Sequence, residues 1–397
     1  MSATIAPADV VAFDGVLPLT ETQRDIQRLA RDFAAEHVAP FAAEWDRDQR
    51  FEPAVVAQLG ASGFLGMLLP EQYDGLALDT SSYLLAIEEI AAADASTAVL
   101  MSVHNSLPTQ MILRFGDEEQ RARYLPPMAR GEKLGGFALS EPDAGSDAAS
   151  LRTQAVRDGD DWVLNGTKAW ITHGTYPDLV LLAMARTDTP DARRGGKGIS
   201  TFIVTPDMPG FRVGKKENKL GLRSSPTVQV VFEDLRVPAA NLVGEEGQGF
   251  VYAMQSLDHG RLGIAAQALG IARAALTAAR DYADQRKQFG QPIRNFQAIQ
   301  FKLADMASRI AAARALLHQT AAAKDRGERV TQFSSMCKLL ASETAMFVAD
   351  EAVQIFGGYG YVKDYPVERY LRDAKVTEIY EGTSEIQRIV IARELYT

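Results

Sequence analysis

Residues 262–286 read LGIAAQALGIARAALTAARDYADQR, a long stretch rich in alanine and other small side chains. Two stretches of the same kind follow it, at residues 295–324 and 331–356. Long helices with small side chains pack closely against antiparallel neighbours, which is the geometry of a four-helix bundle. We therefore expect residues 247–397 to form a C-terminal four-helix-bundle domain.

The pattern changes between residues 135 and 246, where short β-rich runs are separated by turn residues. These runs are GGFALSEP (135–142), DDWVLNGTKAWITHG (160–174), DLVLLAMART (178–187), ISTFIVTP (199–206), FRVGKK (211–216) and TVQVVFEDLRVP (227–238). Asn165 and Gly166 tolerate positive φ angles, so this dipeptide between two strand-like runs predicts a β-hairpin turn. Several antiparallel strands of this kind predict a middle β-barrel-like domain over residues 135–246.

The segment before residue 135 has helical periodicity. Thr20, with Gln23 three residues later, suits a capping box, and Pro40 interrupts the helical pattern that follows. Gly116-Asp117 precedes another charged helix start. We expect an N-terminal helical domain over residues 1–134. The predicted fold class is therefore α+β, mostly α, with the β domain between two helical domains.

Composition and charge narrow the function classes. The 397 residues carry a formal net charge of −9, and 46% of them are hydrophobic. An acidic chain lacks the basic footprint of a nucleic-acid-binding protein, and no uninterrupted apolar run reaches the length of about 20 residues that a spanning helix needs. Since the first twenty residues look like neither a signal nor a transit peptide, we expect a cytoplasmic bacterial protein, or a mitochondrial-matrix one whose presequence was removed.

Motifs of several common enzyme classes are absent from the sequence. The five histidines have no paired spacing and no cysteine partner, so no metal site is expected. The Gly-rich run 357–360 follows a helix rather than a strand, which excludes a dinucleotide fingerprint, and neither a phosphate loop nor a hydrolase elbow occurs. The single cysteine, Cys337, is expected to pack as a small apolar group, and a catalytic thiol is the alternative.

Three local features carry possible chemistry. LSEPDAGSD (139–147) directly follows a strand, and its turn can present hydroxyl and backbone N–H groups, although the pattern by itself is more typical of a solvated loop. Trp170 lies on a strand, where a core or edge position is the ordinary interpretation. Glu381, within IYEGTSEIQR (379–388), stands just before a helix that Thr383 or Ser384 can cap. By itself it is more typical of a capping acid that interacts with the helix dipole than of a catalytic base.

Together, in this order, these features resemble the acyl-CoA dehydrogenase family, and most of all its short-chain and butyryl-type members. The similarity extends from about residue 20 to the end of the chain. Its matching segments are FALSEPDAGSD (137–147), KAWIT (168–172), LDHGRLGIAAQALGIA (257–272), RKQFGQPI (286–293), FQAIQFKLADM (296–306), QIFGGYGY (354–361) and RDAKVTEIYEGTSEIQR (372–388). The resemblance implies a FAD-dependent enzyme, an acyl-CoA substrate, electron-transferring flavoprotein as acceptor, and a homotetramer.

The resemblance also assigns residues to the flavin and the substrate. It implies FAD contacts by Phe137, Leu139, Ser140, Gly145, Ser146, Trp170, Ile171, Thr172, Arg286, Gln297, Gln354, Ile355, Phe356, Gly357, Gly358, Thr383, Ser384 and Glu385. It implies substrate contacts by Ser146, Asp258, His259, Gly260, Arg261 and Gly382. Trp170 is expected against the isoalloxazine ring, and Arg286 suits a pyrophosphate because a guanidinium pairs bidentately with phosphate oxygens.

The resemblance implies that Glu381 is the catalytic base. It would remove a proton from carbon 2 of the acyl thioester while a hydride leaves carbon 3 for the flavin, giving a trans-2-enoyl-CoA. A carboxylate beside an apolar acyl chain is expected to have a raised pKa. Two branches of the family place a Glu directly before the Arg of the LDHGR segment. This chain has Gly260 there, so Glu381 has no rival.

Other interpretations lie further from the sequence. An oxidase relative would be longer or would lack this Glu, and a helical scaffold without flavin would not need all of the matching segments. The glutaryl-type branch of the family has an Arg near the segment that here is 93–103, which binds a second carboxylate. No Arg occurs there in this chain, so the resemblance disfavours a dicarboxyl substrate. Short-, medium- and branched-chain acyl groups all stay open.

Overall fold

The structure is a computed structural model that describes residues 18–187 and 195–396. Seven α-helices precede the first strand: α1 (Glu21–His37), α2 (Ala42–Asp48), α3 (Pro53–Ala61), α4 (Thr80–Ala93), α5 (Ala95–Ser106), α6 (Pro108–Phe115) and α7 (Glu118–Ala129). The predicted capping box is confirmed, because the Thr20 hydroxyl accepts from the Gln23 N–H and the Gln23 side chain accepts from the Thr20 N–H. Asp117 and Gln120 form a second box at the start of α7.

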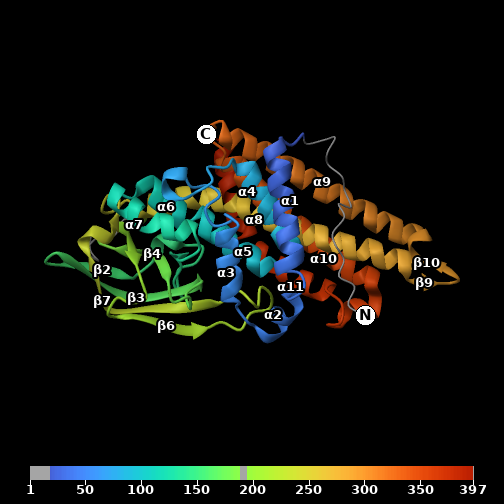
Figure 1. Cartoon of the computed structure of the whole chain (residues 1–397), viewed down its shortest axis with the longest axis horizontal. Helices are drawn as coiled ribbons and strands as arrows, with labels where there is room; N and C mark the ends of the chain where they lie inside the picture. Colours follow the sequence, from blue (N-terminus) through green and yellow to red (C-terminus); the bar gives the residue numbers. More distant parts are fainter. Residues whose placement is uncertain (1–17, 188–194, 397) are drawn as a thin grey trace.

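The middle of the chain forms a curled sheet. Its strands are β1 (Leu134–Ala138), β2 (Gln154–Asp158), β3 (Asp161–Thr172), β4 (Leu179–Arg186), β5 (Ile199–Val204), β6 (Phe211–Lys216), β7 (Thr227–Pro238) and β8 (Leu242–Val243). The order is β6-β7-β3-β2-β4-β5-β8, and β1 pairs in parallel with β4. Side chains from β3, β4, β5 and β7 share one core, which includes Trp162, Leu181, Phe202 and Phe232, so the sheet curls around its own interior. The opposite face packs against α6 and α7 (Figure 1).

The hairpin predicted at Asn165-Gly166 is wrong. Both residues lie inside β3, at a register shift against β7, and the turn between β2 and β3 is at residues 159–160. The Asn165 side chain accepts from the Asp234 N–H at 2.9 Å, so it bridges two strands instead of turning the chain. A Cβ at Gly166 would come within 2.4 Å of Thr153 Oγ1, which explains the glycine by close packing.

The C-terminal region is helical again. It comprises α8 (Gly249–Gln285), a two-residue hairpin pair β9 (Lys287–Gln288) and β10 (Gln291–Pro292), α9 (Gln297–Asp325), α10 (Thr331–Phe356), α11 (Val367–Thr377) and α12 (Ser384–Glu394). The helices α8, α9 and α10 run side by side toward one end of the molecule, where the hairpin lies, and the sheet occupies the other end (Figure 1). The mostly helical fold with a sheet domain between two helical regions agrees with the predicted class.

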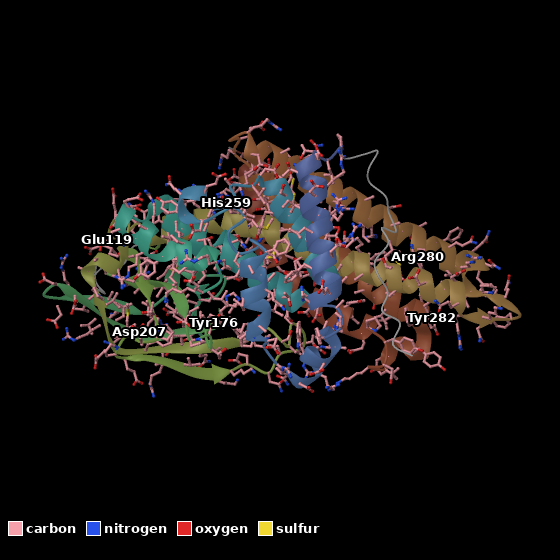
Figure 2. The ribbon with its side chains drawn as sticks, in the orientation of Figure 1. Glu119, Tyr176, Asp207, His259, Arg280 and Tyr282 are labelled. Carbon is pink, nitrogen blue, oxygen red and sulfur yellow. The ribbon has the colours of Figure 1, made fainter. Side chains whose placement is uncertain are left out.

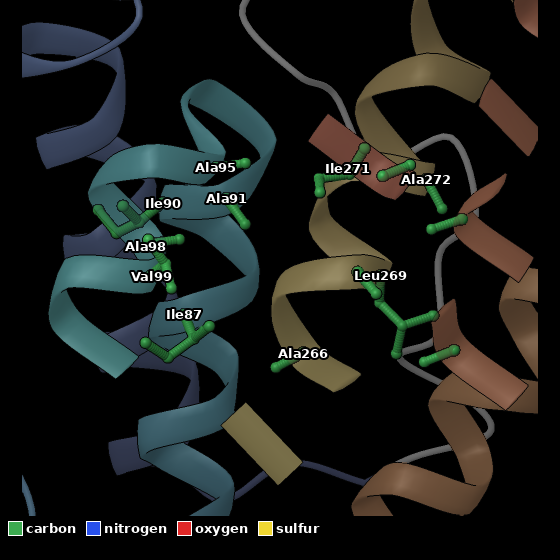
Figure 3. Packing of buried hydrophobic residues seen from close by; sticks show 14 of the residues in the cluster. Ile87, Ile90, Ala91, Ala95, Ala98, Val99, Ala266, Leu269, Ile271 and Ala272 are labelled. Carbon is green, nitrogen blue, oxygen red and sulfur yellow. The ribbon is translucent and has the colours of Figure 1, made fainter. Parts of the chain in front are cut away.

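The central helix α8 connects the two helical regions. The part of α8 that carries Ala266 and Leu269 lies beside the residues Ile87 and Ala98 of α4 and α5 (Figure 3), and all four belong to one core cluster. A Cβ at Gly270 would come within 2.4 Å of the Glu88 carbonyl oxygen, so glycine permits this close approach. By length and composition α8 also resembles a membrane-spanning helix, although the sequence has no uninterrupted apolar run of that length. Its most apolar window is buried inside the protein, as in the core helix of a globular domain.

Candidate active site

Glu381 lies in a short loop between α11 and α12. The Thr383 side chain caps α12 by accepting from the Ile386 N–H at 3.3 Å, and the Ser384 N–H reaches back to the Glu378 carbonyl oxygen at 2.9 Å. Glu381 has φ 49° and Gly382 has φ 92°, so two consecutive residues adopt left-handed conformations. For a non-glycine residue this conformation costs about 1–3 kcal/mol and is found mostly at functional sites. The loop therefore fixes the direction of the Glu381 side chain.

The Glu381 carboxylate points into the protein. Although the residue is only partly buried, both carboxylate oxygens are shielded from solvent and have no hydrogen-bond partner among the described residues. A Cβ at Gly260 on α8 would come within 2.2 Å of Glu381 Oε2 and within 3.1 Å of Leu107. Any larger residue at position 260 would thus occupy the space that the carboxylate uses. The two positions considered as alternative bases are in direct steric contact.

Burial raises the pKa of the Glu381 carboxyl to about 7, against the opposing influence of the Lys338 and Arg261 cations. A general base works best when its pKa lies near the operating pH, because it is then both ionised and basic. The sequence predicts this direction, and its physical cause is the loss of water around a carboxylate without a partner.

Two side chains that were not among the predicted site residues form hydrogen bonds to the backbone of the Glu381 loop. Lys338 on α10 donates from Nζ to the Gly382 carbonyl oxygen at 2.8 Å. Gln387 Nε2 donates to the same oxygen at 2.9 Å and to the Glu381 carbonyl oxygen at 3.2 Å. Sequence reasoning missed Lys338 because it lies 43 residues before Glu381 in an ordinary helical pattern. Gln387 carries a weak signal, since it follows the N-cap Thr383 by four residues and so faces the loop.

One face of α8 continues from the base into the helical region. One turn beyond Gly260, a Cβ at Gly263 would come within 2.4 Å of Ser102 Oγ and 2.8 Å of the Tyr83 hydroxyl oxygen. A further turn on, the Gln267 amide N–H donates to the Ala95 carbonyl oxygen at 2.7 Å, and its oxygen accepts from the Tyr380 hydroxyl. Gly260 and Gln267 are about 10 Å apart along the helix. This face is therefore lined by hydrogen-bonded side chains close to the base.

The remaining predicted substrate residues lie on α8 beside Gly260. Arg261 is buried, and its Nη1 donates to Asp258 at 2.6 Å and to Ser335 at 3.1 Å. His259 faces the other way, where its Nε2 lies 2.8 Å from Arg114 Nη1. Figure 2 shows His259 at the edge of the long helices, beside the N-terminal helices that cover the sheet. Gly382 lies next to Glu381, so Gly260 and Gly382 meet the base, whereas Ser146 lies on the exposed loop after β1.

The predicted flavin segments of the sheet domain form one platform. Glu141 carries the loop 139–147: its carboxylate accepts from Lys168 Nζ at 2.8 Å and from the Arg152 and Thr153 N–H groups at 2.6 and 2.9 Å. The Ala169 N–H donates to the Ser140 carbonyl oxygen at 2.9 Å and ties the loop to β3. Gly145 and Ser146, at the tip of this loop, remain exposed to solvent.

Trp170 departs from the ordinary strand position. Its φ is 64°, and 62% of its surface is exposed, while Ile171 beside it is buried. A large exposed aromatic ring held by a left-handed backbone is unusual for a strand and suits a platform for a planar ligand. Phe137, Leu139, Ser140 and Thr172 complete the same region at partly or fully buried positions.

A second set of predicted flavin residues lies elsewhere. Arg286, Ile355, Phe356, Gly357 and Gly358 line a depression of about 870 Å³ at the end of the bundle. Gln354 belongs to the same end of α10, and Gln297 begins α9. Arg286 lies over the ring of Tyr359 at 5.4 Å and forms no ion pair with the described residues. A free guanidinium beside glycines whose Cβ positions are open suits an anionic ligand such as a pyrophosphate.

The two sets are far apart within one chain. Gly260 lies in α8 and Arg286 directly follows the last residue of that helix, so the 26 residues between them span about 39 Å. Tyr282, one of the residues lining the depression, lies far from His259 in Figure 2. The structure thus groups residues 137–146 and 170–172 on the sheet, and groups 286 and 354–358 at the far end. Thr383, Ser384 and Glu385 lie with Glu381 at the start of α12.

The alternative of a catalytic thiol finds no support. Cys337 is buried on α10 and donates from Sγ to Thr320 Oγ1 at 3.3 Å, and burial raises its pKa to about 12. The thiol is therefore neutral near pH 7 and packs as a small apolar group. Among the described residues, no group of three or more His, Cys, Asp or Glu side chains is placed to hold a metal ion.

Comparison with known families matches nearly the whole chain. Three profiles cover it: the acyl-CoA dehydrogenase N-terminal domain at residues 20–132, the middle domain at residues 136–235 and the C-terminal domain at residues 247–396. The chain belongs to the acyl-CoA dehydrogenase family. Members of the family are FAD-dependent flavoproteins, and this acyl-CoA dehydrogenase homologue is an oxidoreductase.

Individual relatives agree with this membership. The mitochondrial short-chain specific acyl-CoA dehydrogenase of Mus musculus is 50% identical over 95% of this chain and 90% of its own length. Butyryl-CoA dehydrogenase from Megasphaera elsdenii has a TM-score of 0.93 with 45% identity, covering 96% of this chain and 100% of that one. A chain from a structure described as the electron transferring flavoprotein of Acidaminococcus fermentans also has a TM-score of 0.93, with 47% identity over 96% of this chain and 99% of that one.

Proposed function

We propose that this protein catalyses the FAD-dependent α,β-dehydrogenation of a short-chain acyl-CoA to the trans-2-enoyl-CoA, with Glu381 as the base. The observation that carries the proposal is the shielded Glu381 carboxylate, which has no hydrogen-bond partner in the described part of the chain and faces the space opened by Gly260. A structural carboxylate in such a position would be expected to have a cation or N–H partner. An unpaired one is suited to receive a proton from a substrate.

Each neighbouring group then has a task. The Glu381 carboxylate removes the proton from carbon 2, and the Glu381 N–H donates to the thioester carbonyl oxygen as negative charge develops there. FAD, when bound, accepts the hydride that leaves carbon 3. The flavin ring would bind against Trp170, Ile171, Thr172 and residues 137–146. Further contacts to the flavin would come from the start of α12, at Thr383, Ser384 and Glu385. Asp258, His259, Arg261, Gly382 and Ser146 would position the thioester.

The lining of α8 supports a short acyl chain. Tyr83 with Ser102, and Gln267 with Tyr380, are joined by hydrogen bonds on the face that continues from Gly260. A longer chain would have to displace side chains whose polar groups would then lose their partners, at about 1–3 kcal/mol for each buried group. The names of the mouse and Megasphaera relatives point the same way. A panel of acyl-CoA thioesters graded in length and branching, scored by anaerobic flavin bleaching, measures this preference.

The separation of the two flavin segments supports an oligomer. A FAD bound on the sheet platform of one chain cannot also reach Arg286 and residues 354–358 of the same chain if these lie at the distant end of the bundle. A second copy can supply them, and two such pairs would make the homotetramer. We also propose electron-transferring flavoprotein as the acceptor of the electrons. A pull-down with that protein and the rate of air reoxidation test this acceptor.

The decisive experiment for the reaction is Glu381→Gln. The variant should bind FAD and butyryl-CoA but should fail to bleach the flavin under anaerobic conditions, because an amide cannot accept the carbon 2 proton. Loss of about 10²–10⁴-fold in the bleaching rate is expected for removal of a general base. Normal bleaching by Glu381→Gln, with the same FAD content as the unmodified protein, would overturn the assignment.

A further inference from the structure

Lys338 is an unusual residue for the interior of a helical bundle. It lies on α10 with 0% of its surface exposed, and its Nζ donates to the Gly382 carbonyl oxygen. Among the described residues it forms no ion pair, unlike Lys168, whose buried ammonium contacts Glu141 at 2.8 Å. A buried ammonium without a carboxylate partner is costly, so its retention calls for a reason beyond packing.

We propose that Lys338 is a positioning residue for the reaction, which holds the Glu381–Gly382 segment by its hydrogen bond and keeps the Glu381 carboxylate ionised by its charge. The proposal rests on the proposed function, since it concerns how the base is held and charged. It assigns Lys338 no contact with substrate or flavin.

The positional part follows from the backbone. Glu381 and Gly382 both have left-handed φ angles, a conformation that is retained only where the surroundings enforce it. The Gly382 carbonyl oxygen is held from two sides, by Lys338 Nζ at 2.8 Å and by Gln387 Nε2 at 2.9 Å. Fixing this carbonyl fixes the Gly382–Thr383 peptide plane, and the 3.2 Å bond from Gln387 Nε2 to the Glu381 carbonyl oxygen fixes the Glu381–Gly382 plane before it. The Glu381 side chain and its own N–H are therefore held in one orientation before substrate arrives.

The electrostatic part follows from the charges around the base. The Glu381 carboxylate is influenced by Lys338 from α10 and Arg261 from α8, and it in turn raises the pKa of the Tyr83 hydroxyl on α4 and of neighbouring Tyr380. Arg261 is already paired with Asp258 at 2.6 Å, which offsets much of its field. Lys338 has no such partner in the part of the chain that the structure describes, although the more distant Glu378 and Glu385 also act on it, and Arg261 opposes its charge.

The directions agree with a coupled pair. Burial raises the pKa of Glu381 to about 7, and Lys338 and Arg261 lower it from a still higher value. Burial lowers the pKa of Lys338 to about 8, with Glu381 opposing that decrease. Near neutral pH the ionised carboxylate and the ammonium then stabilise each other. Without the ammonium the carboxylate would hold its proton to a higher pH and would be a base less often at pH 7.

Three variants separate the two parts of the proposal. Lys338→Met removes the charge and the donor, Lys338→Gln removes the charge and can keep a donor to Gly382, and Lys338→Arg keeps the charge. The matched control is Lys324→Met, because Lys324 is a half-buried lysine whose pKa is also lowered to about 8 by burial, but it lies near Asp325 and Arg114 and does not act on Glu381.

The measurement is the rate of anaerobic flavin reduction by butyryl-CoA in the FAD-loaded protein between pH 6 and pH 9. Both neutral variants should move the midpoint of the pH profile upward by about one unit or more, which lowers the rate at pH 7 by about fivefold or more with recovery toward pH 9. Lys338→Arg and Lys324→Met should keep the midpoint of the unmodified protein. At pH 9, Lys338→Met should stay slower than Lys338→Gln if the hydrogen bond also positions the base.

A second readout does not depend on turnover. The infrared band of the protonated Glu381 carboxyl, assigned by its loss in Glu381→Gln, can be titrated in each variant. An unchanged band midpoint in Lys338→Met or, if that variant does not fold, in Lys338→Gln, would overturn the inference. An inactive unmodified protein would instead contradict the proposed function, and the infrared titration would still decide whether Lys338 acts on Glu381.

Discussion

Glu89 and Glu381 are both carboxylates withdrawn from water, yet the protein treats them in opposite ways. Glu89 on α4 is held by Arg273 from α8 at 2.6 Å, by Arg31 from α1 at 3.0 Å and by Gln27 at 2.9 Å. Burial would raise the pKa of Glu89, but the cations Arg273 and Arg31 lower it to about 2. The Glu381 carboxylate has no hydrogen-bond partner within residues 18–187 and 195–396, and burial raises its pKa to about 7.

The difference shows that burial alone does not decide what a carboxylate does. Around Glu89, the partners hold the side chain itself, so the group is permanently ionised and fixes α1, α4 and α8 relative to one another. Around Glu381, Lys338 and Gln387 hold the backbone and leave the carboxylate oxygens free. One arrangement uses a charge for structure, and the other keeps a proton acceptor available.

The largest expected effect comes from breaking the paired arrangement. Arg273→Met would leave Glu88 and Glu89 buried with one fewer cation, and loss of one partner of a buried ion pair costs about 3–5 kcal/mol. Urea unfolding at pH 7 with saturating FAD measures this loss. The control Arg280→Met removes a partly exposed pair with Asp281 on the same helix (Figure 2) and should cost about 1 kcal/mol or less. Equal losses in the two variants would show that the buried network contributes nothing special.

The second prediction disturbs the unpaired arrangement by shape. Gly260→Ala would place a methyl group about where Glu381 Oε2 now lies, since the Cβ position is 2.2 Å from that oxygen. Displacement of the base by about 1 Å is expected to reduce the flavin-reduction rate by about 10²-fold. Gly214→Ala on β6 is a control, because its Cβ would meet only Gln229 at 3.2 Å. A Gly260→Ala protein that reduces its flavin at the normal rate would contradict the observed packing of base against α8.

The comparison also marks the limits of prediction from sequence. The three-part fold and the capped start of α1 follow from local patterns, and the loop with Glu381 follows from the family motif. The Asn165-Gly166 hairpin fails because a glycine required for contact with Thr153 has the same local signature as a turn glycine. Lys338 gives no local signal at all, since its role depends on α10 meeting a loop that is distant in sequence. The role of Arg273 is equally impossible to predict from sequence, because a charged residue in a helix is usually exposed and nothing in the local pattern indicates that this one is buried.

The smallest expected effect is on stability, and it has opposite signs for the two carboxylates. The folded-state pKa of Glu381 lies above the value of about 4.3 expected in the unfolded chain, so its contribution to stability is present below about pH 4 and is lost as the pH rises through 7. Glu381→Gln resembles the protonated acid at every pH. It should therefore match the unmodified protein near pH 4 and exceed it by about 1–3 kcal/mol at pH 8.

Glu89 should behave in the reverse manner, because its lowered pKa gives stability that is present above about pH 4.3 and is lost as the pH falls toward 2. Glu89→Gln should thus be destabilising at pH 8, where Glu381→Gln is stabilising. Urea unfolding of the two variants at pH 3, pH 4.5 and pH 8, with FAD held constant, gives both differences, because the Glu89 contribution changes only below about pH 4.3. If Glu381→Gln is no more stable than the unmodified protein at pH 8, the carboxylate is not held at an energetic disadvantage, and its availability as a base must come from geometry alone.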